Sequence, residues 1–359
     1  MKIWDVIIAG GGIIGLSLSL ALRKRGLSVL LIERGEPGRE ASHAAAGMLA
    51  DFSAELPPAL LPLATASAKM YPEFVHELQD ESGVRVDLRE QGTLLVGWHK
   101  HLTLHAESGL EMLTPGAVDE LEPELRKQNG AVFFRKERSV DPRLLTNAAL
   151  LAAKHREVDI VSGNAVEKVI IAAGHAAGVI AGKTTYTAPI VVNCAGAWSA
   201  NIGSPALPVH PVKGHMLALV GAPGLRHVIR TPNVYLVPRA DGRLVIGSTL
   251  EDAGYDKRVD IDKIQRLREL ALELVPSLSK ARLHKAWTGL RPASSDGLPI
   301  LGPAAIEGYF VATGHYRDGI LLTPVTARIM AQVIAGEKTD YNLHPFLPLR
   351  FEQQELATG

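Results

Sequence analysis

The sequence predicts an α/β protein made of two interleaved domains. Three observations lead to this fold class: a length of 359 residues, a globular composition, and a strand, glycine-rich turn, helix and strand in the first 34 residues. At roughly 150 residues per domain, the length corresponds to about two domains. Apolar residues make up 47% of the chain and charged residues 21%, which excludes a disordered or fibrous protein.

Val6 to Ala9 is expected to be a buried strand, and residues 29–32 a second one, with a helix between them. The turn after the first strand reads Gly10-Gly11-Gly12-Ile13-Ile14-Gly15. In such a turn the first glycine allows the tight bend, the second lets the backbone approach a pyrophosphate, and the last lets the helix pack closely on the strand. Glu33 directly follows the second strand, where a carboxylate can accept hydrogen bonds from ribose hydroxyls. A glycine turn alone also occurs in other α/β proteins, but this context favours a Rossmann-like dinucleotide site.

Residues 39–49 form a loop of small side chains after this unit. Small side chains let a bulky planar group, such as an isoalloxazine ring, lie against the backbone. Whether the dinucleotide is NAD or FAD stays open at this point.

The charge balance and the single cysteine restrict the possible partners. Lys and Arg total 38, as do Asp and Glu, so no basic excess is present to neutralise nucleic-acid phosphates. Because Cys194 is the only cysteine in the sequence, an intrachain disulfide is excluded. The lack of disulfides is typical of proteins in a reducing compartment. The uncharged stretch 6–22 contains three consecutive glycines and follows Asp5, unlike a signal peptide or a membrane span. We expect a cytoplasmic protein with no nucleic-acid partner, no membrane partner and no metal.

The rest of the chain contains neither a linker nor an internal repeat, so the domains must be interwoven rather than sequential. We assign residues 1–50, 138–208 and 285–359 to the dinucleotide-binding domain, and 51–137 and 209–284 to a substrate-binding domain. Asp141 is the expected N-cap of a helix that starts at Pro142. The expected helices are 63–82, 142–153, 262–274 and 320–334, and the expected further strands are 84–87, 92–96, 159–162, 190–194, 216–220, 234–238, 244–247 and 309–313.

Together with the first 49 residues, later segments resemble the D-amino-acid oxidase family of FAD enzymes, most closely its glycine-oxidising members. These segments are 193–199, 211–217, 235–239, 242–247, 287–292, 296–299 and 313–322. The resemblance implies a Rossmann-like FAD-binding domain of the GR2, glutathione-reductase-like type, interleaved with an α+β substrate domain on a mixed or antiparallel sheet. It also implies non-covalent FAD, a small amino-acid substrate, O₂, and a homo-oligomer, a tetramer by analogy.

The activity implied by the resemblance is oxidative deamination of glycine, sarcosine and small D-amino acids. Hydride passes from Cα to flavin N5, giving an imine or glyoxylate, ammonia and H₂O₂, for the thiazole ring of thiamine. A neutral amine can expel the hydride with its own lone pair, so the protein's task is to position the substrate.

The resemblance places Arg291 at the family's carboxylate-binding arginine. A guanidinium suits this positioning because it grips a carboxylate through two parallel hydrogen bonds. The resemblance places Tyr235 in the same pocket and Arg317 near flavin and substrate. Surface ion pairs or structural hydrogen bonds are the alternatives for the arginines, and core packing for the tyrosine. Asn233 and Leu250 replace a histidine and a methionine of the glycine-oxidising relatives. The expected substrate-binding residues are Arg291, Arg317, Tyr235, Met48, Asn233 and Leu250.

The resemblance assigns cofactor contacts along the whole chain, with Val166 against the adenine and His315 acting through its backbone. The start of the last helix is expected to face the flavin pyrimidine edge, where its dipole stabilises negative charge. The expected cofactor-binding residues are Gly10, Gly12, Ile13, Ile14, Gly15, Glu33, Arg34, Ala41, Ser42, His43, Ala46, Gly47, Met48, Val166, Ala195, Gly196, Trp198, Gly314, His315, Tyr316, Arg317, Asp318, Gly319, Ile320 and Leu321.

Two residues bear on covalent attachment of the flavin. Some relatives use a histidine directly before Ala-Ala-Gly, but Ala44 stands there and His43 lies one residue earlier. Reactive geometry tolerates little displacement, so we expect the flavin to be held without a covalent bond. Cys194 is expected to be buried and inert.

Three alternatives stay open from the sequence alone. The first is a dehydrogenase of the same family that uses an acceptor other than O₂. The second is an FAD enzyme acting on modified tRNA, against which the net charge of zero argues. The third is a non-catalytic flavin-binding protein, against which Arg291 argues.

Overall fold

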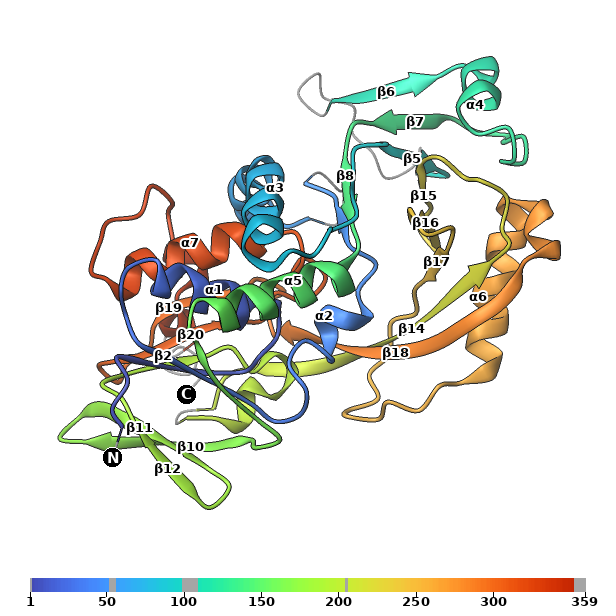
Figure 1. Cartoon of the computed structure of the whole chain (residues 1–359). Helices are drawn as coiled ribbons and strands as arrows, with labels where there is room; N and C mark the ends of the chain where they lie inside the picture. The colour runs from blue at the N-terminus through green and yellow to red at the C-terminus, as the bar shows by residue number, and fades with distance from the viewer. Residues whose placement is uncertain (1, 52–55, 99–108, 204–205, 352–359) are drawn as a thin grey trace, which may run out of the picture.

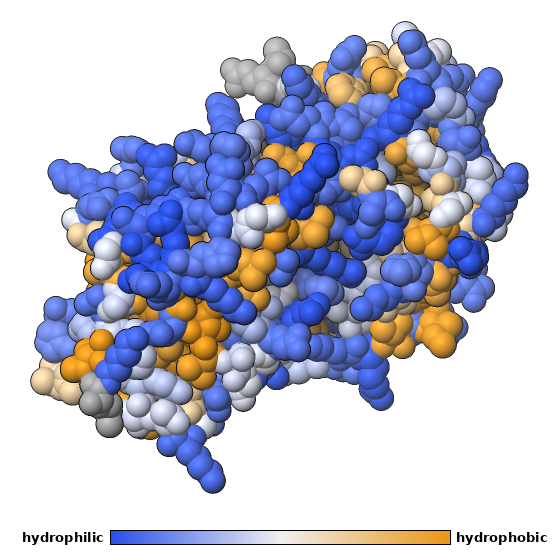
Figure 2. Space-filling model, viewed as in Figure 1, coloured by the Kyte–Doolittle hydropathy of each residue, from blue (hydrophilic) through white to orange (hydrophobic). Residues whose placement is uncertain are grey.

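Two large β-sheets organise the molecule, one in each half of Figure 1. The computed structural model describes residues 2–51, 56–98, 109–203 and 206–351. Within them, none of the helices has both the length and the apolar character needed to cross a membrane. Figure 2 shows hydrophilic residues over most of one face, with hydrophobic residues in separate patches.

The first sheet has six strands in the order β19-β20-β13-β1-β2-β9. Neighbouring strands run parallel except for β19, which is antiparallel to β20. The central strands are continuously apolar, as expected for a parallel sheet covered on both faces. The strands are β1 (Val6–Ala9), β2 (Val29–Glu33), β9 (Asp159–Ser162), β13 (Ile190–Asn193), β19 (Ile300–Pro303) and β20 (Tyr309–Thr313).

Helices cover one face of this sheet and a small antiparallel sheet covers the other (Figure 1). Ile8 and Leu31 belong to the core shared with the helices, whereas Ile7 and Leu30 belong to the core shared with the small sheet. The helices are α1 (Ile13–Arg23), α3 (Leu61–Ser82), α5 (Pro142–His155) and α7 (Thr323–Ile334), and the small sheet contains β10 (Val166–Ala172), β11 (His175–Ala181) and β12 (Thr184–Thr187).

The second large sheet has eight strands in the order β18-β14-β17-β16-β15-β5-β7-β6. Its longest strands, β14 and β18, pair antiparallel along their whole length, and the one parallel contact among these strands joins β15 to β5. The strands are β5 (Thr93–Val96), β6 (Leu110–Leu113), β7 (Val132–Arg135), β14 (Val209–Val220), β15 (Val228–Arg230), β16 (Tyr235–Pro238), β17 (Leu244–Gly247) and β18 (Arg282–Ser294).

The two faces of this sheet have different roles. Leu217 and Leu219 of β14 pack with α6 (Ile261–Leu274). Met216 and Ala218 lie on the opposite face, because side chains alternate along a strand. That second face looks toward the loop that follows β2.

Several short elements connect these layers. They are α2 (Ala41–Ala44), α4 (Pro115–Leu121), the three-stranded sheet of β3 (Met48–Leu49), β8 (Arg138–Val140) and β4 (Leu88–Arg89), and 3₁₀ turns at Pro58–Leu60, Gly196–Asn201, Pro276–Lys280, His344–Phe346 and Pro348–Arg350.

The predicted fold class is confirmed, and so is the N-cap of α5, where the Asp141 carboxylate accepts from the amides of Arg143 and Leu144. The strand expected at 84–87 is wrong, because side chains of Ser82 and Gln79 satisfy the amides of Val84 and Val86 before β4 begins. The last helix begins at Thr323 rather than at residue 320, after a turn over residues 319–322.

Two elements do not fit the expected division into domains. The helix α3 falls within 51–137 but shares a core with α1, α5 and α7. The strand β18 crosses residue 285 and pairs with β14 throughout. We propose the division given by the sequence with these two elements exchanged between the domains.

Candidate functional site

A cavity of about 640 Å³ lies between the two large sheets. At one end it is lined by residues at the carboxyl ends of β1, β2, β13 and β20, where open parallel sheets bind their ligands. At the other end it is lined by Tyr235 and Arg291 of the eight-stranded sheet. The dinucleotide motif and the candidate carboxylate-binding arginine therefore face one cavity.

In the glycine-rich turn between β1 and α1, Gly10 and Gly15 have no space for a Cβ. A Cβ on Gly10, whose φ is +111°, would overlap the carbonyl group of Cys194. A Cβ on Gly15 would overlap the carbonyl oxygen of Gly10. These overlaps involve backbone atoms that cannot move aside, so both positions require glycine, as the motif predicts.

Glu33 is buried at the end of β2 and lines the cavity. Its Oε2 accepts from the Gly11 amide at 2.7 Å and its Oε1 from the Gly35 amide at 2.9 Å. A carboxylate has about four acceptor sites, so capacity remains for hydroxyl donors. The side chain is thus fixed and ready to accept from a ribose.

Aromatic and cationic groups gather beside Glu33. The Arg34 guanidinium lies 4.0 Å from the centroid of the Trp198 ring. Trp198 also stacks on Tyr255, with ring centroids 5.6 Å apart. Val166 lines the same part of the cavity, which suits a flat adenine ring.

The small-residue loop at 41–48 forms the wall between the two ends. The Ser42 hydroxyl accepts from the Ile13 amide at 3.0 Å, which joins the loop to the start of α1. The buried Arg239 donates to the carbonyls of Ala46 and Val140. Trp287 donates to the carbonyl of Ala44 at 3.1 Å. Sequence reasoning assigned no role to Arg239 or Trp287, although both lie in segments that carry the family resemblance.

His43 does not line the cavity, although its neighbours Ser42 and Ala44 do. Its carbonyl accepts from Arg143, and burial, with the nearby Arg143 charge, lowers the pKa of its ring to about 4. This placement gives no support to attachment of a flavin through His43.

Arg291 lies on β18 and is held by two oxygen atoms. Its Nη1 donates to the Thr249 carbonyl at 3.2 Å and its Nη2 to the Ser248 hydroxyl at 2.7 Å. A guanidinium has five N–H donors, so three remain for a ligand. A Cβ on Gly214 would overlap this guanidinium. Gly214 was not predicted as a site residue, because only the pairing of β14 with β18 brings it to Arg291.

Tyr235 is close to the same wall of the cavity. Its hydroxyl donates to the Met216 sulfur at 3.1 Å, and a Cβ on Gly247 would lie only 2.7 Å from that hydroxyl. Met48, Asn233 and Leu250 also line the cavity, and Leu250 is 48% exposed. These residues narrow the pocket beside Arg291 and form its outer rim.

The segment after β20 contributes His315, Arg317 and their neighbours to the cavity. The buried His315 ring lies 3.1 Å from the Thr326 hydroxyl, and burial lowers its pKa to about 4. The ring is therefore neutral and fixed to α7, in agreement with a contact through the backbone. Arg317 lies 5.5 Å from the centroid of the Tyr316 ring.

Most of the predicted site residues line this one cavity, and four do not: Gly15, His43, Gly314 and Leu321. Gly15 faces the backbone of Gly10, and Gly314 packs beside Ile300. Leu321 is buried in the core with α7, because the helix starts two residues after it. Cys194 lines the cavity, and burial raises the pKa of its thiol. Within the described ranges, no group of three or more His, Cys, Asp or Glu side chains is arranged so that it could hold a metal ion.

Comparison with known proteins gives consistent matches. The family model described as "DAO: FAD dependent oxidoreductase" matches residues 5–333. A glycine oxidase of Geobacillus kaustophilus is 34% identical, with 96% of each chain covered. The hydrogen cyanide synthase subunit HcnC of Pseudomonas aeruginosa is 30% identical and covers 100% of this chain, with 99% of its own length matched.

The fold agrees with that of a solved relative. The crystal structure of glycine oxidase from Geobacillus kaustophilus superimposes with a TM-score of 0.92 at 32% identity. The match covers 98% of this chain and 99% of the other.

Proposed function

Because this chain belongs to the DAO family of FAD-dependent oxidoreductases, we propose that it oxidises glycine and other small amines that carry a carboxylate, including sarcosine and small D-amino acids. O₂ is the proposed electron acceptor. One observation carries the proposal: Arg291 lines the same cavity as the dinucleotide motif, and its bonds to Thr249 and Ser248 use only two of its five N–H donors.

The residues of the cavity fit FAD. The turn at 10–15 approaches closely because Gly10 and Gly15 carry no side chain, and Glu33 offers acceptors for ribose hydroxyls. Trp198 and Val166 would hold the adenine, and the small-residue loop at 41–48 would lie along the flavin. When bound, FAD supplies an acceptor for the hydride that leaves the amine carbon and passes both electrons on to O₂.

Arg291 determines how the substrate lies. Two parallel N–H donors fix both the distance and the plane of a carboxylate, and so place the adjacent carbon. Loss of hydride from that carbon needs the lone pair of a neutral amine rather than a protein base. The buried His315 ring contacts Thr326, and its lowered pKa makes it a weak base, so no proton-transfer role is assigned to it.

The side chains around Arg291 set the size of the substrate. Met48, Met216 and Tyr235 enclose the space beside the guanidinium, whereas Asn233 and Leu250 form the rim. One methylene in an apolar pocket changes discrimination by about 1–3 kcal/mol. The two replacements at the rim should therefore adjust the preference among small amines without changing the reaction.

The test mixes the purified yellow protein without oxygen with glycine, sarcosine, D-alanine and D-proline in turn. Three results would support the proposal. Glycine should abolish the visible absorption of the flavin, the absorption should return when air is added, and one H₂O₂ should form per glyoxylate. Loss without recovery would indicate a dehydrogenase instead. Absorption unchanged by all four amines would contradict the substrate assignment.

We also infer, from the family resemblance, that the imine product serves the thiazole ring of thiamine. A cytoplasmic location and a homo-oligomer remain predictions from the sequence.

A further inference from the structure

The segment 248–260, which joins β17 to α6, holds both partners of Arg291. Ser248 supplies its hydroxyl and Thr249 its carbonyl. Apart from one β-bridge between Glu251 and Lys213, this segment is irregular, so its conformation depends on contacts from outside it. The position and orientation of the Arg291 guanidinium therefore depend on the contacts that fix residues 248–260.

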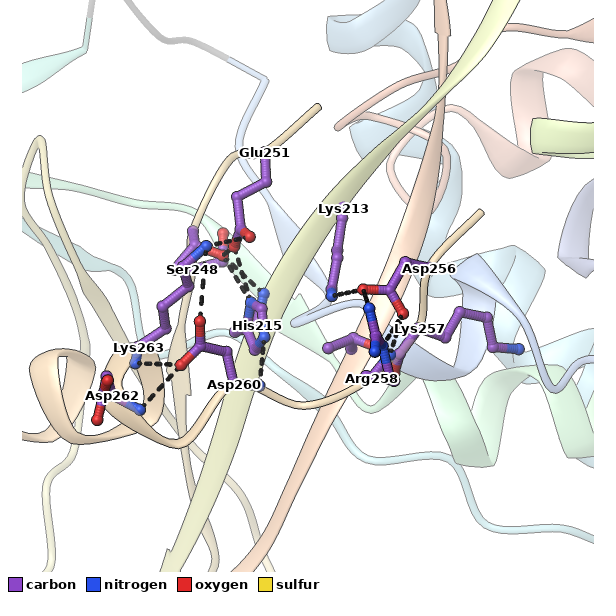
Figure 3. A network of polar contacts seen from close by, with 12 residues as sticks. Lys213, His215, Ser248, Glu251, Asp256, Lys257, Arg258, Asp260, Asp262 and Lys263 are labelled. Atoms are coloured by element: carbon purple, nitrogen blue, oxygen red, sulfur yellow. Dashed lines mark hydrogen bonds and ion pairs between the residues drawn. The ribbon is translucent and has the colours of Figure 1, made fainter. Parts of the chain in front are cut away.

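His215, a fully buried residue of β14, contacts this segment near both ends (Figure 3). Its Nε2 accepts from the Asp260 amide at 2.9 Å. An amide N–H can only donate, so the ring proton lies on Nδ1. Nδ1 in turn lies 2.8 Å from Glu251 Oε1 and donates to it.

Thr249 connects this network to Arg291. Its hydroxyl accepts from the His215 amide at 2.9 Å and donates to Glu251 Oε1 at 2.6 Å. The carbonyl of the same residue accepts from Arg291. Only one residue therefore separates the buried imidazole from the guanidinium.

Further contacts hold the remainder of the segment. Lys213, two residues before His215, pairs with Asp256 at 3.2 Å, as Figure 3 shows. Lys263 of α6 pairs with Glu251. Lys257 pairs with Glu40, beside the small-residue loop. These ion pairs lie nearer to solvent than His215, whose exposed side-chain fraction is 0%.

We propose that His215 is a positioning residue for the substrate carboxylate. Its ring contacts Glu251 and Asp260 and its backbone amide donates to Thr249, and these contacts together hold the Ser248 and Thr249 oxygens that aim Arg291. This inference rests on the proposed function, because it assigns to Arg291 the binding of a carboxylate. It does not require glycine to be the best substrate.

The test measures the dissociation constant of glycolate, a simple carboxylate without an amine, for the oxidised holoenzyme through the change in flavin absorption. His215→Leu should weaken glycolate binding about tenfold, since a net hydrogen bond contributes about 1 kcal/mol and the two ring bonds to Glu251 and Asp260 are lost. His215→Gln keeps one donor and one acceptor, so its affinity should lie between those of His215→Leu and the wild type. The KM for glycine should follow the same order, with a smaller change in kcat.

His227→Leu is the matched control. His227 lies 3.0 Å from the buried Glu122 carboxylate and does not line the cavity. Its loss should lower stability in the same way but leave glycolate affinity unchanged. Equal affinity in His215→Leu and the wild type, or equal weakening in both leucine variants, would overturn the proposal.

A second pair of variants applies if His215→Leu does not fold. Thr249→Val removes the hydroxyl and keeps the carbonyl, and should weaken glycolate binding, whereas Thr249→Ser should not. Equal binding by both Thr249 variants would overturn the proposal.

If the wild-type holoenzyme binds neither glycolate nor glycine, the proposed function fails and this inference fails with it. If the wild type binds and the variants bind equally, only this inference fails.

Discussion

The two ends of the cavity are built in different ways. The motif at the dinucleotide end, residues 6–33, is one continuous stretch, in which Gly10 and Gly15 let backbone segments approach each other closely. The arginine end consists of side chains from β14, β16 and β18 together with the segment after β17. One end depends on local conformation, and the other on the register of long strands.

This difference determines how each end responds to mutation. At the dinucleotide end, an added methyl group would meet backbone that cannot move. At the arginine end, it would meet the tip of a flexible side chain, which can move aside while the fold remains intact. Variants at the first end should therefore lose cofactor or stability, and variants at the second should lose affinity for the substrate alone.

The largest effect is expected at Gly15. Gly15→Val would place its side chain against the Gly10 carbonyl and push α1 away from β1, so the purified protein should retain little or no flavin. Flavin content per polypeptide, read from the absorption spectrum, measures this. Gly116→Ala in α4, where a Cβ meets nothing within 4 Å, is the control and should remain yellow. A fully loaded Gly15→Val protein would contradict the assignment of the turn.

The next largest effect is expected at Arg291. Arg291→Ala removes the paired donors, and truncation of one partner of a buried charge pair costs about 2–5 kcal/mol. The KM for glycine should rise by roughly 30-fold or more, with flavin still bound. Arg291→Lys should recover only part of the affinity, because an ammonium cannot bind in two-point geometry. Steady-state kinetics test this, and an unchanged KM in Arg291→Ala would show that the carboxylate binds elsewhere.

A pH-dependent effect follows from His315. Its pKa in the folded protein, about 4, lies below the ordinary value of 6.5. The unfolded chain therefore takes up a proton in this range that the folded protein does not, so stability is full above about pH 6.5 and falls toward pH 4. The contribution is about 3 kcal/mol at most. Measured by denaturant unfolding, the free energy of unfolding should fall less between pH 7 and pH 4 in His315→Gln than in the wild type. Parallel curves for the two proteins would contradict this role of His315.

The smallest effect, and the most specific, is expected at Gly214. In Gly214→Ala the new methyl group displaces the Arg291 guanidinium, which can move at little cost to the fold. The KM for glycine should rise about tenfold, which corresponds to 1.4 kcal/mol, with a nearly unchanged melting temperature. Gly224→Ala, where nothing lies within 4 Å, should change neither value. A large loss of stability in Gly214→Ala would remove the distinction between the two ends.

The sequence predicts the dinucleotide end well, because its determinants are local. The apolar run, the three glycines and Glu33 lie within 28 residues and need no tertiary information. The same local reasoning fails at 84–87, where alternating valines suggest a strand but neighbouring side chains satisfy the backbone amides.

The arginine end could be predicted only in part. The resemblance indicates Arg291 and Tyr235, but the residues that hold them follow from strand pairing. Gly214 stands opposite Gly289 in the register of β14 and β18, and this pairing brings it to Arg291. His215 is likewise an unremarkable histidine in the sequence, and its role follows from the path of residues 248–260.

The most direct test compares glycine with methylamine, which has the same amine but no carboxylate, in anaerobic mixing with the wild-type holoenzyme. If Arg291 places the substrate through its carboxylate, glycine should abolish the visible flavin absorption rapidly and methylamine at equal concentration should leave it unchanged. Equal reduction by the two amines would contradict the account.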